Sequence, residues 1–483
     1  MSTSNIPLLI GGKSQDTSEH LEIKSALTGD LVTVAAAATV SDANQAAEAA
    51  SAAFPEWSAQ APNARRAALN RAADALDAKA DEFVSAMMGE IGATEGWARF
   101  NLMLAVSIVR EAASLTTQIN GEIIPSDKPG QLSMGMREPV GVILSIAPWN
   151  APIILGVRAI AVPLACGNTV IFKASEICPR THYLIASAFM EAGLGDGVVN
   201  FISNTPQDAG EIVGALIDHP AVRRINFTGS SNVGRIIAER AAKNLKPVLL
   251  ELGGKAPLLV LEDADVDAAV DAAAFGAFMN QGQICMSTER VIVVEAIADD
   301  FLAKFKAKVD QLAVGDPAEG KTPLGAVVHQ KSVEHIEALI ADAVEKGATR
   351  LCGQDANGVL MPANVVSELT PEMRIYSEES FGPVVGVIRA ANEEEAINIA
   401  NDSEYGLSAA VFTRDIARGL QVARRINSGI CHVNGPTVQD QAQIPFGGVK
   451  NSGYGRFGGK AGIDAFTDLR WITVATQPEH YPF

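Results

Sequence analysis

The sequence is poor in aromatic residues for its length. Phenylalanine, tryptophan and tyrosine together make up 5% of the 483 residues, although apolar residues make up 48%. Such a chain can bury a large core, but the core suits helices packed closely over sheets better than an aromatic-rich β sandwich. We therefore expect an α/β protein that divides into two or three folded units.

Cysteine is also scarce, and no cysteines stand at paired or metal-binding spacing. The five are Cys166, Cys178, Cys285, Cys352 and Cys431. An odd number, in a chain whose first ten residues lack the features of a secretory signal, indicates reduced thiols. We expect a cytoplasmic protein with no metal site, in which most of these cysteines are inert core residues.

Positive charge is in deficit, and no long apolar run is uninterrupted. The formal net charge of −18 repels nucleic acid and anionic lipid, so we expect neither as a partner. The most apolar stretch, residues 142–172, contains Asn150, Arg158 and three prolines. These residues predict a buried strand and helix and argue against a membrane span.

The order of the predicted elements indicates two α/β lobes. Residues 41–118 have apolar residues at helical spacing, with Ser41 as a plausible N-cap. Beyond them, β-rich runs alternate with helical segments, which is typical of a parallel, doubly wound sheet. Strands are predicted at 142–146, 169–172, 198–201, 224–227 and 247–251, and helices at 182–192 and 206–217.

A second alternating series follows Cys285 and predicts a second lobe. Its predicted strands are 290–294 and 384–389, and its predicted helices are 298–312 and 332–346. Residues 121–138 and 465–474 resemble strands that no helix covers. Because bare strand edges usually find a partner, we expect these segments to support oligomerisation.

Two strand ends have features of a nucleotide site. Residues 224–234 predict a strand, a turn containing Gly229 and Ser230, and a helix containing Gly234, whose free amides could hold a phosphate. The spacing is looser than G-x-G-x-x-G, so an ordinary βα turn explains it equally well. At the other strand end, Lys173 and Glu176 could flank a cofactor or form a surface ion pair. A carboxylate there would favour NAD over NADP.

Three further residues suggest covalent catalysis. Cys285 lies among short polar residues that predict a tight turn near solvent, although a single cysteine is more often a buried apolar residue. Glu251 ends an apolar strand, where burial would raise its pKa toward that of a general base, or it is a plain rim residue. Asn150 stands between two prolines, as a rigid oxyanion donor would, or is a turn asparagine.

Together these segments resemble the aldehyde dehydrogenase superfamily over essentially the whole chain. The sequence looks closest to the bacterial salicylaldehyde and benzaldehyde dehydrogenases of aromatic catabolism. Seven pieces occur in the family's order: Pro148-Trp-Asn150, Lys173-Ala-Ser-Glu176, Phe227-Thr-Gly-Ser230 with Gly234, Leu250-Glu-Leu-Gly-Gly254, Gly282-Gln-Ile-Cys285, Glu379-Ser-Phe-Gly-Pro383 and Pro445-Phe-Gly-Gly448.

The resemblance implies three parts with an active site between the first two. They are a Rossmann-type dinucleotide-binding domain (1–120 and 140–251), a catalytic α/β domain (252–450) and a small β oligomerisation arm (121–139 and 460–483). A homodimer or homotetramer would follow.

By motif, the resemblance assigns a role to each candidate residue. Cys285 would be the nucleophile, Asn150 and the Cys285 amide the oxyanion donors, and Glu251 the general base. NAD would be the cofactor. The residues expected to bind it are Ile146, Trp149, Lys173, Glu176, Gly229, Ser230, Gly234, Glu379 and Phe381.

Two positions depart from the family pattern. Many members have a glutamate directly after the Gly-Arg near the C-terminus, whereas Phe457 follows Gly455-Arg456 here, so Glu251 would act without a second carboxylate. Many also have another cysteine beside the nucleophile. Here Ile284 and Met286 flank Cys285, which removes the nearest disulfide partner.

The expected substrate is an aromatic aldehyde, specifically salicylaldehyde, which would be oxidised to salicylate through a thioester. The pocket residues implied are Trp97, Leu155, Arg158, Ile284 and Phe446. Arg158 could instead bind the carboxylate of succinate semialdehyde, or pair with a structural acid, so a succinate-semialdehyde or broad-specificity enzyme stays open. Glu251 argues against an enzyme that transfers the acyl group to coenzyme A. The presence of all three catalytic candidates argues against a non-enzymatic binding protein.

Overall fold

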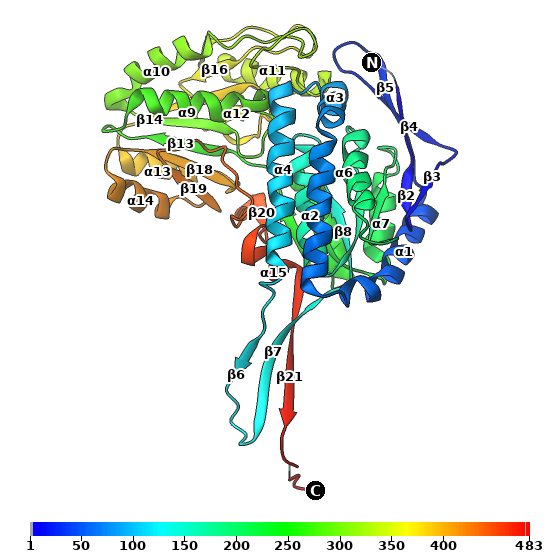
Figure 1. The fold of residues 1–483 in the computed structure, drawn as a ribbon. Coiled ribbons are helices and arrows are strands. Elements are labelled where there is room, and N and C mark those ends of the chain that lie inside the picture. The colour runs from blue at the N-terminus through cyan, green and yellow to red at the C-terminus, as the bar shows by residue number, and fades with distance from the viewer. Residues whose placement is uncertain (1–2, 479) are drawn as a thin grey trace.

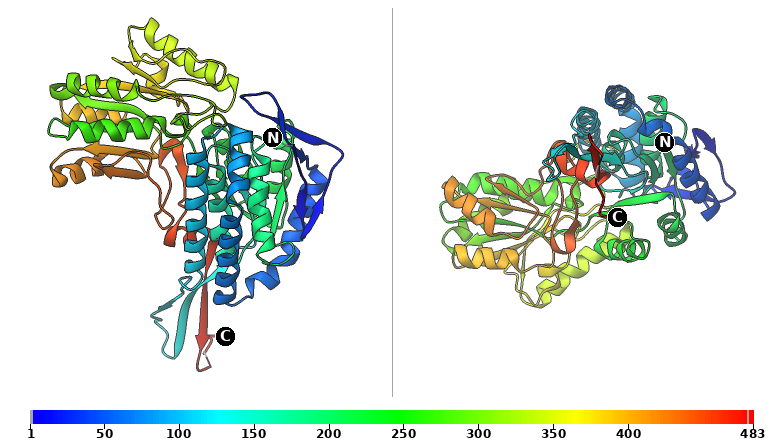
Figure 2. Two further views of the ribbon diagram at one scale, coloured as in Figure 1. Left: turned by 45° about the horizontal axis from the view of Figure 1, so that its top comes forward. Right: turned by 90° about the horizontal axis from the view of Figure 1, so that it is seen from below.

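The computed structural model describes residues 3–478 and 480–483, which form two α/β lobes and a projecting arm (Figure 1). The lobe built mostly from the first half of the chain lies on one side and the lobe built from residues 256–433 on the other, as all three views show (Figures 1 and 2). The arm extends away from both lobes.

The first lobe is organised around an eight-stranded sheet in the order β20-β12-β11-β8-β9-β10-β2-β3. Its five central strands are parallel and confirm the five predicted ones: β8 (Val142–Ile146), β9 (Thr169–Lys173), β10 (Val199–Ile202), β11 (Val222–Thr228) and β12 (Val248–Glu251). The antiparallel edge strands were not predicted: β2 (Leu8–Ile10), β3 (Lys13–Gln15) and β20 (Gly453–Tyr454).

Helices cover both faces of this sheet, as a doubly wound fold requires. On one face lie α2 (Pro62–Ala78), α3 (Ala80–Ile91), α4 (Glu95–Leu115), α5 (Pro152–Ala165) and α6 (Pro179–Glu191). On the other lie α1 (Val40–Ser58), α7 (Ala209–Asp218) and α8 (Ser231–Lys243). A small sheet of β1 (Ser4–Ile6), β5 (Leu31–Ala36) and β4 (His20–Lys24) was also not predicted.

The predicted N-cap of the first helix was wrong by two residues. Thr39, not Ser41, caps α1: the Asp42 amide donates to Thr39 Oγ1, and the Thr39 amide donates to the Asp42 carboxylate at 2.8 Å. The reciprocal pair satisfies two amides that the first helical turn leaves without partners. Ser41 lies inside the helix.

The second lobe contains a seven-stranded sheet in the order β15-β16-β17-β14-β13-β18-β19. The strands are β13 (Ala256–Val260), β14 (Thr288–Val294), β15 (Thr349–Cys352), β16 (Asn364–Ser367), β17 (Val384–Ala390), β18 (Ser408–Phe412) and β19 (Ile430–Val433). The helices are α9 (Val266–Phe278), α10 (Glu295–Val309), α11 (Gln330–Glu345), α12 (Arg374–Ser377), α13 (Glu393–Asn401) and α14 (Ile416–Arg425). The predicted second lobe is confirmed, and its nucleophile turn lies between α9 and β14.

The arm is a three-stranded antiparallel sheet in the order β21-β7-β6. Its strands are β6 (Glu122–Ile124), β7 (Gln131–Pro139) and β21 (Thr467–Ala475), so both uncovered segments are strands as predicted. Just before β21, α15 (Gly459–Phe466) contacts α4 and α5 of the first lobe. The exact domain boundaries stay a prediction. Within the described residues, no helix combines the length and apolarity needed to cross a membrane.

Candidate active site

A strained turn presents Cys285 between the two lobes. After α9 the chain forms a short 3₁₀ segment, Met279–Gly282, in which Asn280 and Gln281 have φ angles of 50° and 56°. Side chains other than glycine rarely adopt this left-handed region, and such strain persists only where surrounding contacts enforce it. Cys285 lies in the turn that follows, as predicted.

Two buried glutamine side chains hold this turn against the segment 325–328. Gln281 donates from Nε2 to the Ala326 carbonyl at 2.9 Å and accepts from the Gly325 amide at 3.0 Å, while Gln283 accepts from the Val328 amide at 2.9 Å. These contacts hold the turn in place, and among residues 280–290 only Cys285 keeps partial exposure. The expectation of a turn near solvent was right only for the nucleophile.

Asn150 is placed to donate to an oxygen near Cys285. Its side chain is buried, and its amide nitrogen donates one hydrogen bond to the Gln283 carbonyl at 2.9 Å. An amide nitrogen has two N–H donors, so the second is available for a substrate oxygen. Trp97 Nε1, at 3.0 Å, and Asn280 Nδ2, at 3.1 Å, donate to the Asn150 carbonyl and fix this residue's backbone.

Glu251 ends β12 and is 2% exposed. Burial raises the pKa of its carboxyl to about 8, and the charges of Arg158 and Arg456 offset the effect only in part. Neither carboxylate oxygen meets a donor at normal hydrogen-bond geometry in the described part of the chain. Gly447 leaves the space beside it, because a Cβ there would lie 2.7 Å from Glu251 Oε1. The carboxylate is therefore free to act as a base.

Burial also raises the pKa of the Cys285 thiol above its ordinary value, and the nearby carboxylates of Glu251 and Glu379 raise it further. The resting Cys285 side chain is thus a neutral thiol, which would have to lose its proton before it could act as a nucleophile. Cys285, Glu251 and Asn150 all line one cavity of about 200 Å³, so a carboxyl group and an amide donor face the same cavity as the cysteine.

That cavity continues into a larger one at the carboxyl edge of the first sheet. The two share Pro148, Trp149, Thr228, Gly229 and Ser230, and the larger has a volume of about 520 Å³. Ser230 is the N-cap of α8 and accepts from the Val233 amide at 3.4 Å. A helix N-terminus at a strand edge is a typical position for a dinucleotide phosphate.

The other proposed cofactor residues surround the same cavities, with one exception. Ile146, Lys173 and Glu176 line the larger cavity, and Glu379 and Phe381 line the smaller one. Gly234 faces Leu252 instead, and a Cβ there would lie 2.6 Å from that side chain. Gly234 therefore lets α8 pack closely on the strand end.

Lys173 and Glu176 form an ion pair that is largely buried, whereas the alternative interpretation expected a pair on the surface. Lys173 is 4% exposed, and Glu176 accepts a further hydrogen bond from Asn204 at 3.1 Å. Burial alone would raise the pKa of Glu176, but the adjacent Lys173 charge brings it below its usual value. The cavity edge therefore presents a carboxylate that stays ionised.

Glu379 and Phe381 are at the junction of the smaller cavity with the second lobe. The Gly254 amide donates to Glu379 Oε1 at 2.7 Å, and burial raises the pKa of this carboxyl to about 7. Phe381 packs edge-on against Trp149, with 5.7 Å between the ring centroids. Residues from both lobes therefore meet where a nicotinamide end would lie.

On the other side of Cys285 lies a third cavity, of about 380 Å³, with mainly apolar walls. All five predicted pocket residues line it: Trp97, Leu155, Arg158, Ile284 and Phe446. Sequence reasoning missed other lining residues, among them Phe100, Met279, Val438 and Asp440. No local motif marks these positions, since they come together only through folding.

Asp440 is the most consequential of the missed residues. Its carboxylate pairs with Arg158 at 2.5 Å, and the guanidinium lies 4.4 Å from the Phe446 ring centroid. Both side chains are at least nine-tenths buried. Arg158 Nη1 and Asp440 Oδ1 are buried without a hydrogen-bond partner among residues 3–478 and 480–483, and both residues line the cavity.

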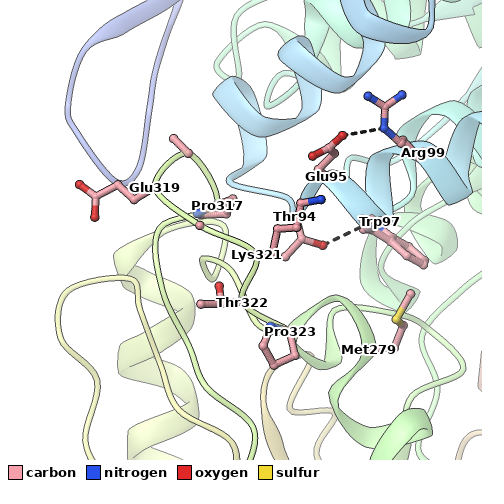
Figure 3. Close-up of a pocket in the computed structure, with 13 residues that line it drawn as sticks. Thr94, Glu95, Trp97, Arg99, Met279, Pro317, Glu319, Lys321, Thr322 and Pro323 are labelled. Carbon is pink, nitrogen blue, oxygen red and sulfur yellow. Dashed lines mark hydrogen bonds and ion pairs between the residues drawn. The ribbon is translucent and has the colours of Figure 1, made fainter.

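A groove of about 960 Å³ adjoins this third cavity (Figure 3). The start of α4, Met279 and the loop 317–323 line it, and Figure 3 shows Trp97 and Met279 on the side opposite Glu319. Trp97 and Met279 line the third cavity as well. The groove and the third cavity are therefore neighbours that share Trp97 and Met279.

A cysteine between a dinucleotide-type cavity and a mainly apolar one is the arrangement expected of an oxidoreductase that works through a covalent intermediate. The sequence model of the aldehyde dehydrogenase family matches residues 13–472. The chain belongs to this family and is an oxidoreductase acting on aldehydes, with a nicotinamide cofactor of the NAD(P) type.

Individual relatives resemble the chain over nearly its whole length. A vanillin dehydrogenase of Pseudomonas fluorescens is 57% identical over 480 residues, covering 99% of both chains. A salicylaldehyde dehydrogenase of Pseudomonas putida is 52% identical over 475 residues, covering 98% of both. The crystal structure of a salicylaldehyde dehydrogenase from Pseudomonas putida G7 complexed with salicylaldehyde matches with a TM-score of 0.98, 51% identity and complete coverage of both chains.

Proposed function

We propose that this protein is a cytoplasmic, NAD-dependent dehydrogenase that oxidises hydroxylated aromatic aldehydes, with salicylaldehyde to salicylate as the leading reaction. The observation that carries the proposal is the third cavity, whose mainly apolar lining includes the buried Arg158–Asp440 pair, with Nη1 and Oδ1 left without a hydrogen-bond partner among the described residues. A volume of about 380 Å³ is near the lower end of small-molecule sites, which suits a single substituted ring.

The Arg158–Asp440 pair supports a neutral substrate over a carboxylate. A substrate such as succinate semialdehyde would have to compete with Asp440 for the guanidinium, and would bring a second negative charge beside the Asp440 carboxylate. A ring hydroxyl can donate to Asp440 Oδ1 and accept from Arg158 Nη1 without displacing either partner. A buried site built for a hydroxyl discriminates strongly against analogues that lack it.

Vanillin is a second candidate substrate, because the vanillin dehydrogenase relative is 57% identical over 99% of both chains. Vanillin also has a ring hydroxyl, but at a different position from that of salicylaldehyde. The two candidates therefore share the proposed recognition of a hydroxyl and differ in where the ring must lie.

The chemistry follows from the residues beside the sulfur. Cys285 adds to the aldehyde carbonyl as a thiolate after its proton leaves to solvent, and the second N–H of Asn150 stabilises the resulting oxyanion. A nicotinamide held beside Trp149, Glu379 and Phe381 would supply the hydride acceptor that this oxidation requires. Collapse leaves a thioester on Cys285, and Glu251 then takes a proton from the water that releases the acid.

The test compares kcat/KM for salicylaldehyde, vanillin, benzaldehyde and succinate semialdehyde, with NAD or NADP and without coenzyme A. We expect both hydroxylated aldehydes to exceed benzaldehyde, succinate semialdehyde to be last, and NAD to be preferred. A clear preference for succinate semialdehyde would refute the aromatic proposal, and a strict need for coenzyme A would refute hydrolysis.

Asp440→Asn tests how the ring hydroxyl is recognised. The substitution keeps the size of the side chain but removes the charge that pairs with Arg158. We expect the advantage of salicylaldehyde over benzaldehyde to fall by about tenfold or more, since a lost charged hydrogen bond costs roughly 1.5–3 kcal/mol. An unchanged ratio of the two kcat/KM values would contradict this recognition.

A further inference from the structure

Lys255 and Glu289 form a buried ion pair outside the three cavities described above. Lys255 Nζ and Glu289 Oε2 are 2.6 Å apart, and their side chains are 0% and 5% exposed. Neither residue lines those cavities. A buried pair is costly to desolvate and is weak evidence for added stability, so its position in the fold is the informative feature.

The pair joins the two segments that carry the catalytic residues. Lys255 follows Glu251 by four residues, and Glu289 follows Cys285 by four. Lys255 immediately precedes β13, Glu289 lies in β14, and these strands are parallel neighbours in the second sheet. The ion pair therefore connects the segment of the general base with the segment of the nucleophile.

Glu289 also anchors the loop that carries Glu379 and Phe381. It accepts from the Ser380 amide at 3.0 Å, from Ser380 Oγ at 2.6 Å and from the Phe381 amide at 3.1 Å. Lys255 Nζ donates to Ser380 Oγ at 3.3 Å. Phe381 has a φ of 47°, a left-handed conformation that an aromatic residue rarely adopts without such support.

The same loop has a second anchor one residue before the lysine. The Gly254 amide donates to the Glu379 carboxylate, so consecutive residues, Gly254 and Lys255, contact consecutive loop residues, Glu379 and Ser380. Any shift of the loop would then move both side chains that line the smaller cavity.

We propose that Lys255 and Glu289 are positioning residues, which set the loop 379–381 at a fixed distance from Cys285 and Glu251 and so hold the nicotinamide end of the cofactor over the nucleophile. The inference rests on the proposed function in one respect, the binding of the nicotinamide end by Glu379 and Phe381. The pair makes no contact with substrate, and its effect on the reaction is through the loop.

Glu289→Gln tests the proposal, because it keeps the shape of the side chain but removes its charge and turns one acceptor into a donor facing the Ser380 and Phe381 amides. We expect the dissociation constant for NAD, measured by quenching of protein fluorescence without aldehyde, to rise on the order of tenfold to a hundredfold. The single-turnover rate of NADH formation should fall as well. KM for the aldehyde should change less than threefold, roughly, since the third cavity does not include the loop.

Glu90→Gln is the matched control. Glu90 is 3% exposed and accepts hydrogen bonds from the Arg180 amide, the Thr181 amide and Thr181 Oγ1, so the same substitution removes a buried carboxylate of similar contacts. We expect it to lower Tm without changing NAD affinity. If Glu289→Gln likewise lowers only Tm, the pair is merely structural and the proposal is overturned.

Ser380→Ala keeps the proposal testable if Glu289→Gln does not fold. It removes only the hydroxyl that bridges Glu289 and Lys255. We expect NAD affinity to fall several-fold with the aldehyde KM unchanged, and unchanged NAD affinity would refute the proposal. A wild-type protein that binds NAD but oxidises no aromatic aldehyde would refute the proposed substrate and leave this binding test intact.

Discussion

Glu251 illustrates how the chemistry depends on a single residue's surroundings. Its carboxyl is buried, lacks well-placed donors and has a pKa raised to about 8. An acid with that pKa is mostly protonated at pH 7 and becomes a base as pH rises through 8. We therefore expect the steady-state rate to rise between pH 6.5 and 9.

Glu251→Gln should remove this limb of the pH profile. The thioester should still form, giving a burst of about one NADH per active site, followed by turnover slowed about 100-fold or more, as expected for loss of a general base. Rapid-quench measurement of NADH from pH 6 to 9 checks both effects. A glutamine variant that keeps the limb near pH 8 would assign the titration to another group.

Glu176 should decide between NAD and NADP. Its ionised carboxylate would accept hydrogen bonds from a ribose hydroxyl and repel a 2′-phosphate, whereas Lys173 beside it would attract one. In Glu176→Ala we expect the NADP/NAD ratio of kcat/KM to rise at least about tenfold. Glu239→Ala removes the same charge from an exposed site on α8 and should leave the ratio unchanged. Equal ratios in both variants would exclude Glu176 as the selectivity residue.

At the scale of elements, the loop between β12 and β13 passes very close to the turn that contains Cys285. The loop leaves no room there for a side chain. A Cβ on Gly254 would lie 2.2 Å from the Cys285 carbonyl oxygen, well below the distance real Cβ atoms adopt. Gly254→Ala must therefore displace the turn, the connection or both.

For Gly254→Ala we expect kcat/KM to fall about 100-fold, because small misplacements of reacting groups have effects of that size. The rate of Cys285 alkylation by iodoacetamide reports the displacement directly. Gly320→Ala is the control, since a Cβ there meets open space. Wild-type alkylation and turnover in Gly254→Ala would show that the contact is tolerated.

For the whole molecule, the arm should determine oligomeric state. Ile124, Leu469 and Trp471 share one face of the arm sheet and are 42%, 63% and 73% exposed, and no helix in the described part of the chain covers this sheet (Figure 1). Exposed apolar side chains in such a group mark an interaction surface. We propose a homodimer or homotetramer that forms through the arm.

The double variant Leu469→Glu/Trp471→Glu should be a monomer, because charges on both side chains oppose burial. Light scattering after gel filtration measures the mass. Ile416→Glu places the same charge on α14, at a position 64% exposed, and should leave the mass unchanged. An arm variant of wild-type mass would contradict the assignment of this surface.

Much of the fold was predictable because its central strands and helices are coded by local pattern. The runs at 142–146 and 247–251 alternate with helical segments. They form β8 and β12, which lie on either side of β11 in the parallel part of one sheet. The edge strands were missed because they are short and exist only through pairing with distant segments. Leu9, for example, pairs with Phe201, and Gly453 pairs with Glu251.

The sequence alone determined which residues have the chemistry: a thiol at Cys285, a carboxyl at Glu251, an amide at Asn150 and a family pattern that orders them. Only the tertiary structure decided how those groups behave, because burial, charge and pairing are set by residues remote in the chain. Asp440 reaches Arg158 across 282 residues, and Glu289 reaches Phe381 across 92. Local patterns cannot encode such contacts, since they arise from the packing of whole elements.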